Sequence, residues 1–333
     1  MLSVLLSAVA LLQPSDDDKK IRGLIEELKL EDASARRKAL DALLDRGKRA
    51  VPAAIEVLED TRHGLKDQVD DLVGRLASRE WKDRDAAQKS IVRLGRHARE
   101  FLQAHEGNAD AEVAWRVKAA LAEIEERERE EAGYEYLRNA GLCEFLGLAA
   151  EGDAKAVALL LKQLETPPTT NPALAEAHLA LRVRAAEALG RLRATLPDAK
   201  AHDVAEHALE LLKRNRDRRQ CIALVQTLGR LRSEAAVTPL DSLVDDPERR
   251  DVHLKRAALR ALAAIGDPRG VARAIKSLAS EDVYMRDAAI EVLVEVAGQD
   301  FGLDPRQAPD AARERIQAAR AWWEKKYGKE WSE

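Results

Sequence analysis

The stretch KRAALRALAAIGDPR, residues 255–269, predicts one helix, a glycine-centred turn and the start of a second helix. Its first part carries an apolar stripe at helical spacing, formed by Leu259, Leu262 and Ile265. After Gly266 a second stripe follows, formed by Val271, Ile275 and Leu278. Because each helix alone would leave its stripe exposed to water, we predict that the two helices pack as a pair.

The same unit recurs along the chain, with a basic residue eleven positions before the turn residue. The copies in register are Arg36 before Gly47, Arg84 before Gly95, Arg182 before Arg193, and Lys255 before Gly266. Two imperfect copies follow Arg219 and Arg286, the second with a slip of one residue. Turns at Gly190, Gly229 and Gly266 would lie 39 and 37 residues apart, which suits a two-helix repeat. We expect the recurring basic residue to have a structural role, such as an ion pair or a carbonyl contact between successive helices.

Composition supports an all-α fold. The chain has 333 residues, 34% of them charged and only 4% aromatic. With 17 Gly and 11 Pro it has too few turn residues for the many short strands of a sandwich or barrel. The net charge of −4 excludes a generally polycationic nucleic-acid coat.

Two places interrupt the repeat and suggest how the chain is divided. Residues 112–139 contain no proline and many glutamates, which predicts one long acidic helix. The segment ETPPTTNP, residues 165–172, predicts a loop, because proline removes backbone donors and fixes φ. We therefore assign repeats to residues 19–130 and 153–298, with a joint at residues 131–152. In the tail, residues 299–333, an apolar helix face is expected to cap the last repeat through Ile316, Ala319, Trp322 and Trp323.

The first residues, MLSVLLSAVALL at positions 1–12, form a short uncharged block before a polar segment. They fit the apolar region of a secretory signal, and Ala8-Val9-Ala10 fits a cleavage site. We expect residues 1–18 to be a signal peptide with an acidic linker; the alternative is an N-terminal helix that docks on the first repeat of a cytoplasmic protein. No other segment is apolar enough to cross a membrane. Cys143 and Cys221 lie in apolar helical contexts and are expected to be buried single thiols.

The segments GDPR, residues 266–269, and RAAEALG, residues 184–190, resemble HEAT repeats of the kind also found in phycobilisome bilin lyases. This resemblance implies a right-handed α-solenoid of helical-pair repeats with a curved surface for protein binding. The tail is similar to the endings of exported HEAT-repeat proteins of planctomycete-type bacteria. HEAT arrays serve unrelated tasks, so the resemblance implies an architecture and not an activity.

Catalytic and metal-binding motifs are missing from the sequence. The histidines form no His-Glu-x-x-His motif, and we expect surface imidazoles at His63, His97, His105, His178, His202, His207 and His253. A di-iron site like that of deoxyhypusine hydroxylase needs several His-Glu dipeptides, and the chain has one, His105-Glu106. A helical-repeat DNA glycosylase needs a basic face beside its aromatic residues, whereas the part around Trp81 and Trp115 is acidic. We expect no enzyme activity, no cofactor and no metal.

One segment stands out by its charge. Residues 182–232 hold twelve basic and six acidic side chains, and the densest part contains Lys213, Arg214, Arg216, Arg218 and Arg219. These residues either cap helices and form ion pairs between repeats, or they form a docking strip for an acidic protein or another polyanion.

The sequence therefore predicts a non-catalytic scaffold or adaptor that binds another protein. The alternatives are an accessory subunit of an enzyme, as in the bilin lyases, and a polyanion binder that uses residues 182–232. A nucleic-acid partner is not expected, and the oligomeric state stays open.

Overall fold

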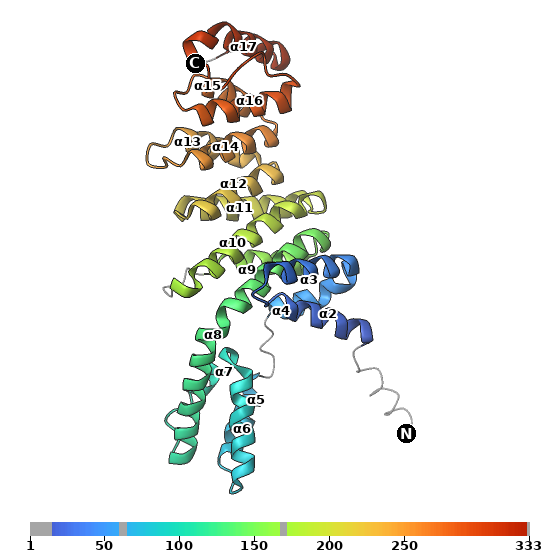
Figure 1. The fold of residues 1–333 in the computed structure, drawn as a ribbon, viewed down its shortest axis with the longest axis vertical. Coiled ribbons are helices and arrows are strands. Elements are labelled where there is room, and N and C mark those ends of the chain that lie inside the picture. The colour runs from blue at the N-terminus through green and yellow to red at the C-terminus, as the bar shows by residue number, and fades with distance from the viewer. Residues whose placement is uncertain (1–14, 60–64, 167–171, 332–333) are drawn as a thin grey trace. The chain divides into compact units, whose positions relative to one another are not determined.

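Figure 1 shows the computed structural model, which describes residues 15–59, 65–166 and 172–331. Every regular element in these ranges is a helix, as the composition predicts. The chain divides into two compact units, Met1–Leu142 with Pro168–Ala180 and Cys143–Pro167 with Leu181–Glu333. The predicted signal peptide at residues 1–12 and residues 167–171 of the predicted loop lie outside the described residues. Among the described helices, none is both long and apolar enough to span a membrane.

The first unit begins with short helices and ends in a long one. Its α-helices are α2 (Asp16–Glu27), α3 (Ala33–Arg46), α4 (Val51–Glu59), α5 (Leu65–Leu76), α6 (Trp81–Leu94), α7 (Arg96–Gln103) and α8 (Ala111–Ala149), with a 3-10 turn, η1 (Gly47–Ala50), before α4. Helix α8 has 39 residues, so the predicted long acidic helix is confirmed. It is longer than expected, because it continues through most of the predicted joint at residues 131–152 and crosses the boundary between the units.

The core of this unit around α5 to α8 is aliphatic. Residues from all four helices are buried together, among them Val69, Leu76, Ile91, Leu102 and Ile124. Further along α8, Gly141 lies against Leu28 at the end of α2, where a Cβ would be 3.2 Å from the leucine side chain. Small residues there let the two helices approach closely.

Helices α9 to α17 follow one another in chain order (Figure 1), and all of them lie in the second unit except the start of α10, which belongs to the first. They are α9 (Ala154–Leu164), α10 (Pro172–Arg191), α11 (Asp198–Arg214), α12 (Arg218–Leu231), α13 (Val237–Asp245), α14 (Val252–Ile265), α15 (Pro268–Ser277), α16 (Val283–Ala297) and α17 (Arg313–Tyr327). Three 3-10 turns accompany them, η2 (Leu192–Ala194), η3 (Glu234–Ala236) and η4 (Pro309–Ala312).

Helices of the second unit pack in two rows. In one row α12 contacts α14, and α14 contacts α16. In the other, α13 contacts α15, and α15 contacts α17. The rows are joined because α11 packs on α12, α13 on α14 and α15 on α16. Each helix pair therefore buries its apolar stripes against its own partner and its neighbours.

The stretch at residues 255–269 forms the predicted helix pair. Leu259, Leu262 and Val271 are almost fully buried, on α14 and α15. Gly266 ends α14 with φ +85°, a backbone conformation that favours glycine. The next residue, Asp267, caps α15 by accepting a hydrogen bond from the backbone N–H of Arg269, and Pro268 occupies the first turn.

The recurring arginine binds backbone carbonyls, as predicted. In three copies its Nη1 donates to the carbonyls five and six residues earlier, in the loop that precedes its helix. These copies are Arg36 to Leu30 and Glu31, Arg84 to Ser78 and Arg79, and Arg286 to Ser280 and Glu281. Arg182 donates to the carbonyl of Thr166, 3.2 Å away. In these four copies the arginine ties its helix to the end of the preceding element or to the loop before the helix.

The turns predicted at Gly190 and Gly229 are wrong. Gly190 and Gly229 lie inside α10 and α12, and both are buried. A Cβ on Gly229 would lie 2.8 Å from the Cα of Ala261, and one on Gly190 would lie 3.2 Å from the Cα of Thr227. These glycines are needed because successive helices approach closely there. The turn after α12 is formed instead by Arg232, with φ +53°.

The aromatic tail covers the end of the second unit. Ile316, Ala319 and Trp323 of α17 are buried, whereas Trp322 is only partly buried and contacts Phe301. The indole Nε1 of Trp323 donates a hydrogen bond to the carbonyl of Pro268, 2.9 Å away. Helix α17 therefore packs on α15 in the place that the sequence predicts for a cap.

Candidate functional site

The predicted basic strip lies at the end of α11, the connection after it and the start of α12. Lys213, Arg214, Arg216, Arg218 and Arg219 are all exposed. Lys213 pairs with Glu210 on its own helix, and the Nη2 of Arg214 lies 4.0 Å from Glu165. Arg219 also has an interaction partner.

Two other arginines of the strip hold the ends of helices. The Nη1 of Arg216 donates to the carbonyl oxygens of Lys213 and Asn215, at 2.9 and 3.1 Å. The Nε of Arg218 lies 3.0 Å from Asp251, the residue that caps α14. Arg216 therefore caps the end of α11, which is one of the two roles expected for this strip. Because Lys213, Arg214 and Arg218 lie near carboxylates, the strip is not a single patch of unpaired charge.

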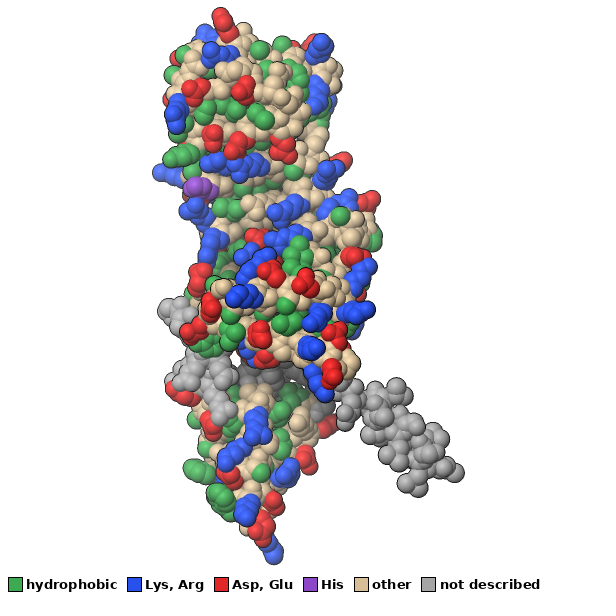
Figure 2. Space-filling model, turned by 45° about the vertical axis from the view of Figure 1, so that its right-hand side comes forward, with side chains coloured by type: hydrophobic (Ala, Val, Ile, Leu, Met, Phe, Trp, Pro, Cys, Tyr) green, Lys and Arg blue, Asp and Glu red, His purple; other side chains and the backbone are tan. Residues whose placement is uncertain are grey.

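A groove of about 570 Å³ runs along α12 and α14, beside the strip. One wall carries Arg218, Gln226 and Arg230, which lie on an i, i+4 ladder of α12. The other wall belongs to α14 and carries His253, Arg256, Arg260 and Ala264, and Glu295 of α16 adds an acidic group. On the face drawn in Figure 2, basic side chains gather beside a row of acidic ones in the C-terminal unit.

The arginines of the two walls differ in their partners. On α14, Arg256 lies 3.3 Å from Asp287 of α16, and the Nε of Arg260 donates to Glu291 at 3.0 Å. On α12, Arg218 pairs with Asp251. Arg230 is exposed and forms no ion pair with any residue that the structure describes. Arg230 therefore carries a positive charge without an ion-pair partner within the described chain, in a groove that Glu295 also lines.

The floor of the groove is apolar and shallow. It is formed by Ile222, Gly229, Ala257 and Ala261. Because Gly229 has no side chain, the backbones of α12 and α14 approach closely beneath it. A bound chain would thus meet aliphatic surface below and guanidinium groups at the sides, a combination typical of a binding site with a few orienting polar groups.

Sequence reasoning found only one end of this groove. Arg218 belonged to the predicted strip, but Arg230, Arg256 and Arg260 did not. A signal was present: the N-caps Asp217, Asp251 and Asp282 of α12, α14 and α16 align the helices at offsets of 34 and 31 residues. At the offset of 31, Arg256 matches Asp287 and Arg260 matches Glu291, the two ion pairs observed.

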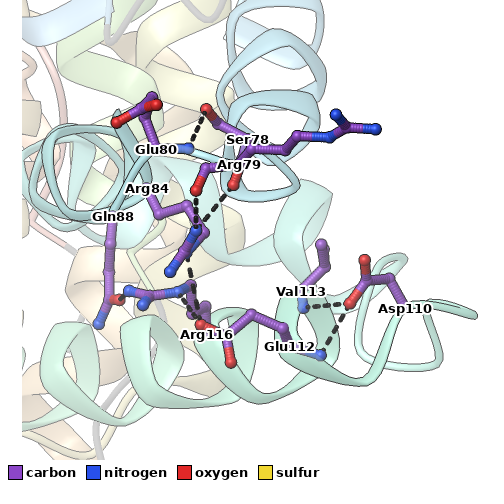
Figure 3. A network of polar contacts seen from close by, with 9 residues as sticks. All are labelled: Ser78, Arg79, Glu80, Arg84, Gln88, Asp110, Glu112, Val113 and Arg116. Carbon is purple, nitrogen blue, oxygen red and sulfur yellow. Dashed lines mark hydrogen bonds and ion pairs between the residues drawn. The ribbon is translucent and has the colours of Figure 1, made fainter. Parts of the chain in front are cut away.

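A polar network in the first unit joins α6 to α8 (Figure 3). The buried guanidinium of Arg116 donates to Glu112 from Nε and to Gln88 from Nη1, both at 2.8 Å. The Nε of Arg84 lies 3.6 Å from the same Glu112 carboxylate, while its Nη1 holds the loop carbonyls. The Arg116 guanidinium is satisfied within this network, whereas the Nε of Arg84 is buried and makes no hydrogen bond among the described residues. The contacts join α6 to α8.

Metal binding finds no support in the described part of the chain, where no cluster of His, Cys, Asp and Glu is arranged to hold an ion. His105 bonds to Asp70 at 2.8 Å, and hydrogen bonds from Lys66 and then His105 lower the pKa of that carboxyl. The sequence predicted His178 at the surface, and this prediction is wrong: the His178 side chain is buried and packs against the Tyr136 ring. His63 lies outside the described residues, as does the side chain of His97.

The two thiols are buried, as predicted. Burial raises the pKa of Cys143 well above its usual range, and burial also raises that of Cys221, which the neighbouring Arg249 opposes. Since the thiolate is the reactive form, we expect neither cysteine of the native chain to react with Ellman's reagent at pH 8 within minutes. Both should react in 8 M urea. A rapid reaction of either thiol in the native chain would contradict this burial.

Comparison with known proteins gave no match: no protein-family profile matches the chain, and no curated protein sequence matches it significantly.

Proposed function

We propose that this protein is a non-catalytic adaptor that binds another protein in the groove of α12 and α14. The observation that carries the proposal is the groove itself, with an apolar floor and arginines on both walls. Arginine and buried aliphatic surface are frequent at the centres of protein interfaces. The walls belong to packed helices, so little conformational freedom would be lost on binding.

We further propose that the second unit is a right-handed α-solenoid of HEAT-like helix pairs, capped by α17. The two rows of successive helices, the aspartate caps and the arginine–carbonyl contacts all support a repeat. In such an array each pair contacts only its neighbours, which gives a long surface without a deep catalytic cavity.

The test is capture of partners from an extract of the source cell by the tagged full chain and two variants. Ile222→Glu places a carboxylate on the floor of the groove, where it can pair with the wall arginines and fill the space. Arg214→Gln changes an exposed charge outside the groove. We expect a discrete protein to be captured by the parent and by Arg214→Gln, and lost with Ile222→Glu.

Other results of this capture would overturn the proposal. Equal capture by the parent and Ile222→Glu would place docking elsewhere on the chain. Capture of nucleic acid or another polyanion that disappears between 50 and 300 mM salt would favour the polyanion binder instead. If the captured protein is an enzyme whose rate changes in the purified complex, the chain is an accessory subunit, which is the alternative that the bilin-lyase resemblance implies.

A further inference from the structure

We propose that the groove binds an extended acidic peptide segment, with one carboxylate at Arg218, a second at Arg230 and an apolar side chain between them. This inference rests on the proposed function, because it specifies the chemistry of the partner at the same groove.

The length of the groove sets the distance between the two carboxylates. Arg218 and Arg230 lie twelve residues apart on one helix and both line the groove. At about 1.5 Å per residue this separation is about 18 Å. An extended chain rises about 3.3 Å per residue, so two acidic residues six positions apart span about 20 Å, nearly the same distance, and their side chains point to the same side of the chain.

The lining of the groove favours an extended chain over a helix. A docked helix presents a continuous apolar stripe at positions i, i+3, i+4 and i+7. Here the apolar floor consists of Ile222, Gly229, Ala257 and Ala261 and is flanked by arginines on both walls. This lining suits a single extended backbone, whose side chains alternate between the floor and the walls.

Arginines outnumber carboxylates in the lining of the groove, which favours an acidic occupant. Four arginines line it, against one carboxylate, Glu295. Three of them already have acidic partners, because Arg256 and Arg260 contact side chains of α16 and Arg218 pairs with Asp251. Arg230 is without an ion-pair partner among the described residues, and Arg218 is half exposed beside Asp251.

The stem of Arg230 passes beside Gly190 of α10. A Cβ on Gly190 would lie 3.2 Å from the Cδ of Arg230, so the missing side chain makes room for the stem of the arginine. The exposed guanidinium lines the groove twelve residues after Arg218. An arginine can bind a carboxylate through two parallel hydrogen bonds.

Two labelled nine-residue peptides test the inference by fluorescence anisotropy with the full chain. One has aspartates at positions 2 and 8 and a leucine at position 5, with alanine elsewhere; the other has the same composition but adjacent aspartates. We expect the spaced peptide to bind about tenfold more tightly, because only it can reach both arginines at once.

Variants of the protein test the same contacts by changing the arginine instead of the peptide. Arg230→Gln should weaken binding of the spaced peptide about tenfold, whereas Arg230→Lys should retain part of the affinity and Arg214→Gln should leave it unchanged. Circular dichroism of each variant checks that the fold is retained. Equal affinities of the two peptides, or equal losses with Arg214→Gln and Arg230→Gln, would overturn the inference.

The two proposals fail in different ways. If Ile222→Glu abolishes capture of the cellular partner while the spaced and adjacent peptides bind alike, the groove docks a protein but not through spaced carboxylates. If Ile222→Glu changes neither capture nor peptide binding, the proposed function fails together with this inference.

Discussion

Replacing Arg286 by methionine should lower the free energy of unfolding of the second unit by about 3 kcal/mol. The Arg286 side chain is only 8% exposed and donates to three carbonyl oxygens, those of Ser280, Glu281 and Pro305, at 2.7 to 2.9 Å. Methionine fills much of the same volume but donates nothing. The carbonyls would lose charge-assisted hydrogen bonds, so the loop before α16 and the loop before α17 would both loosen.

Urea denaturation followed by circular dichroism measures this loss. Arg313→Met is the matched control, because Arg313 is exposed on α17 and only pairs with Asp310 on the surface. Such pairs contribute about 0–1 kcal/mol, so the control should be close to the parent. If both variants lose the same stability, the carbonyl contacts of Arg286 do not stabilise the fold. Arg286→Lys should be intermediate, because an ammonium group cannot reach all three carbonyls with the geometry of a guanidinium.

The sequence reveals these arginine contacts because they are local. Each arginine reaches carbonyls only five and six residues earlier, so its position relative to the helix start repeats from copy to copy. The turn glycines Gly47, Gly95, Gly266 and Gly298 are equally local, since a positive φ at a helix end depends on that residue alone. Features of this kind appear as fixed spacings in a single sequence.

Gly190 and Gly229 show why the remaining features were harder to predict. A glycine in a sequence is compatible with a turn and with a close contact between helices. The neighbours that distinguish these cases, Thr227 and Ala261, lie more than thirty residues away along the chain. Only the packing of successive repeats brings them together, so local sequence assigned both glycines to turns.

The candidate site was only partly predictable for a similar reason. The run from Lys213 to Arg219 is recognisable in the sequence because its charged residues are close together along the chain. The groove instead collects one residue per helical turn from two helices, so Arg230 and Arg260 are isolated in sequence but share a surface. Aligning the aspartate caps Asp217 and Asp251 would have matched Arg230 with Ala264 and Gln226 with Arg260, all of which line the groove.

Truncating Trp323 to alanine should destabilise the cap by about 4 kcal/mol, in the range for removal of a buried tryptophan. The Trp323 side chain is 5% exposed and packs against the Tyr327 and Trp331 rings. Its removal would leave a cavity and would also leave the carbonyl of Pro268 without the indole donor. Because each helix pair depends on its neighbours, the loss should spread first to α15.

Hydrogen–deuterium exchange resolves where the stability is lost. In Trp323→Ala, amides of α15 and α17 should exchange about a thousandfold faster, because 1.4 kcal/mol corresponds to a factor of ten in the exchange rate. Amides of α2 and α3 should keep the rates of the parent. Trp322→Ala should have a much smaller effect, since Trp322 is only partly buried beside Phe301. If the two truncations accelerate exchange equally, the cap is held by general aromatic contacts and not by the buried indole. If neither does, α17 is not a cap, and the second unit must be stable without it.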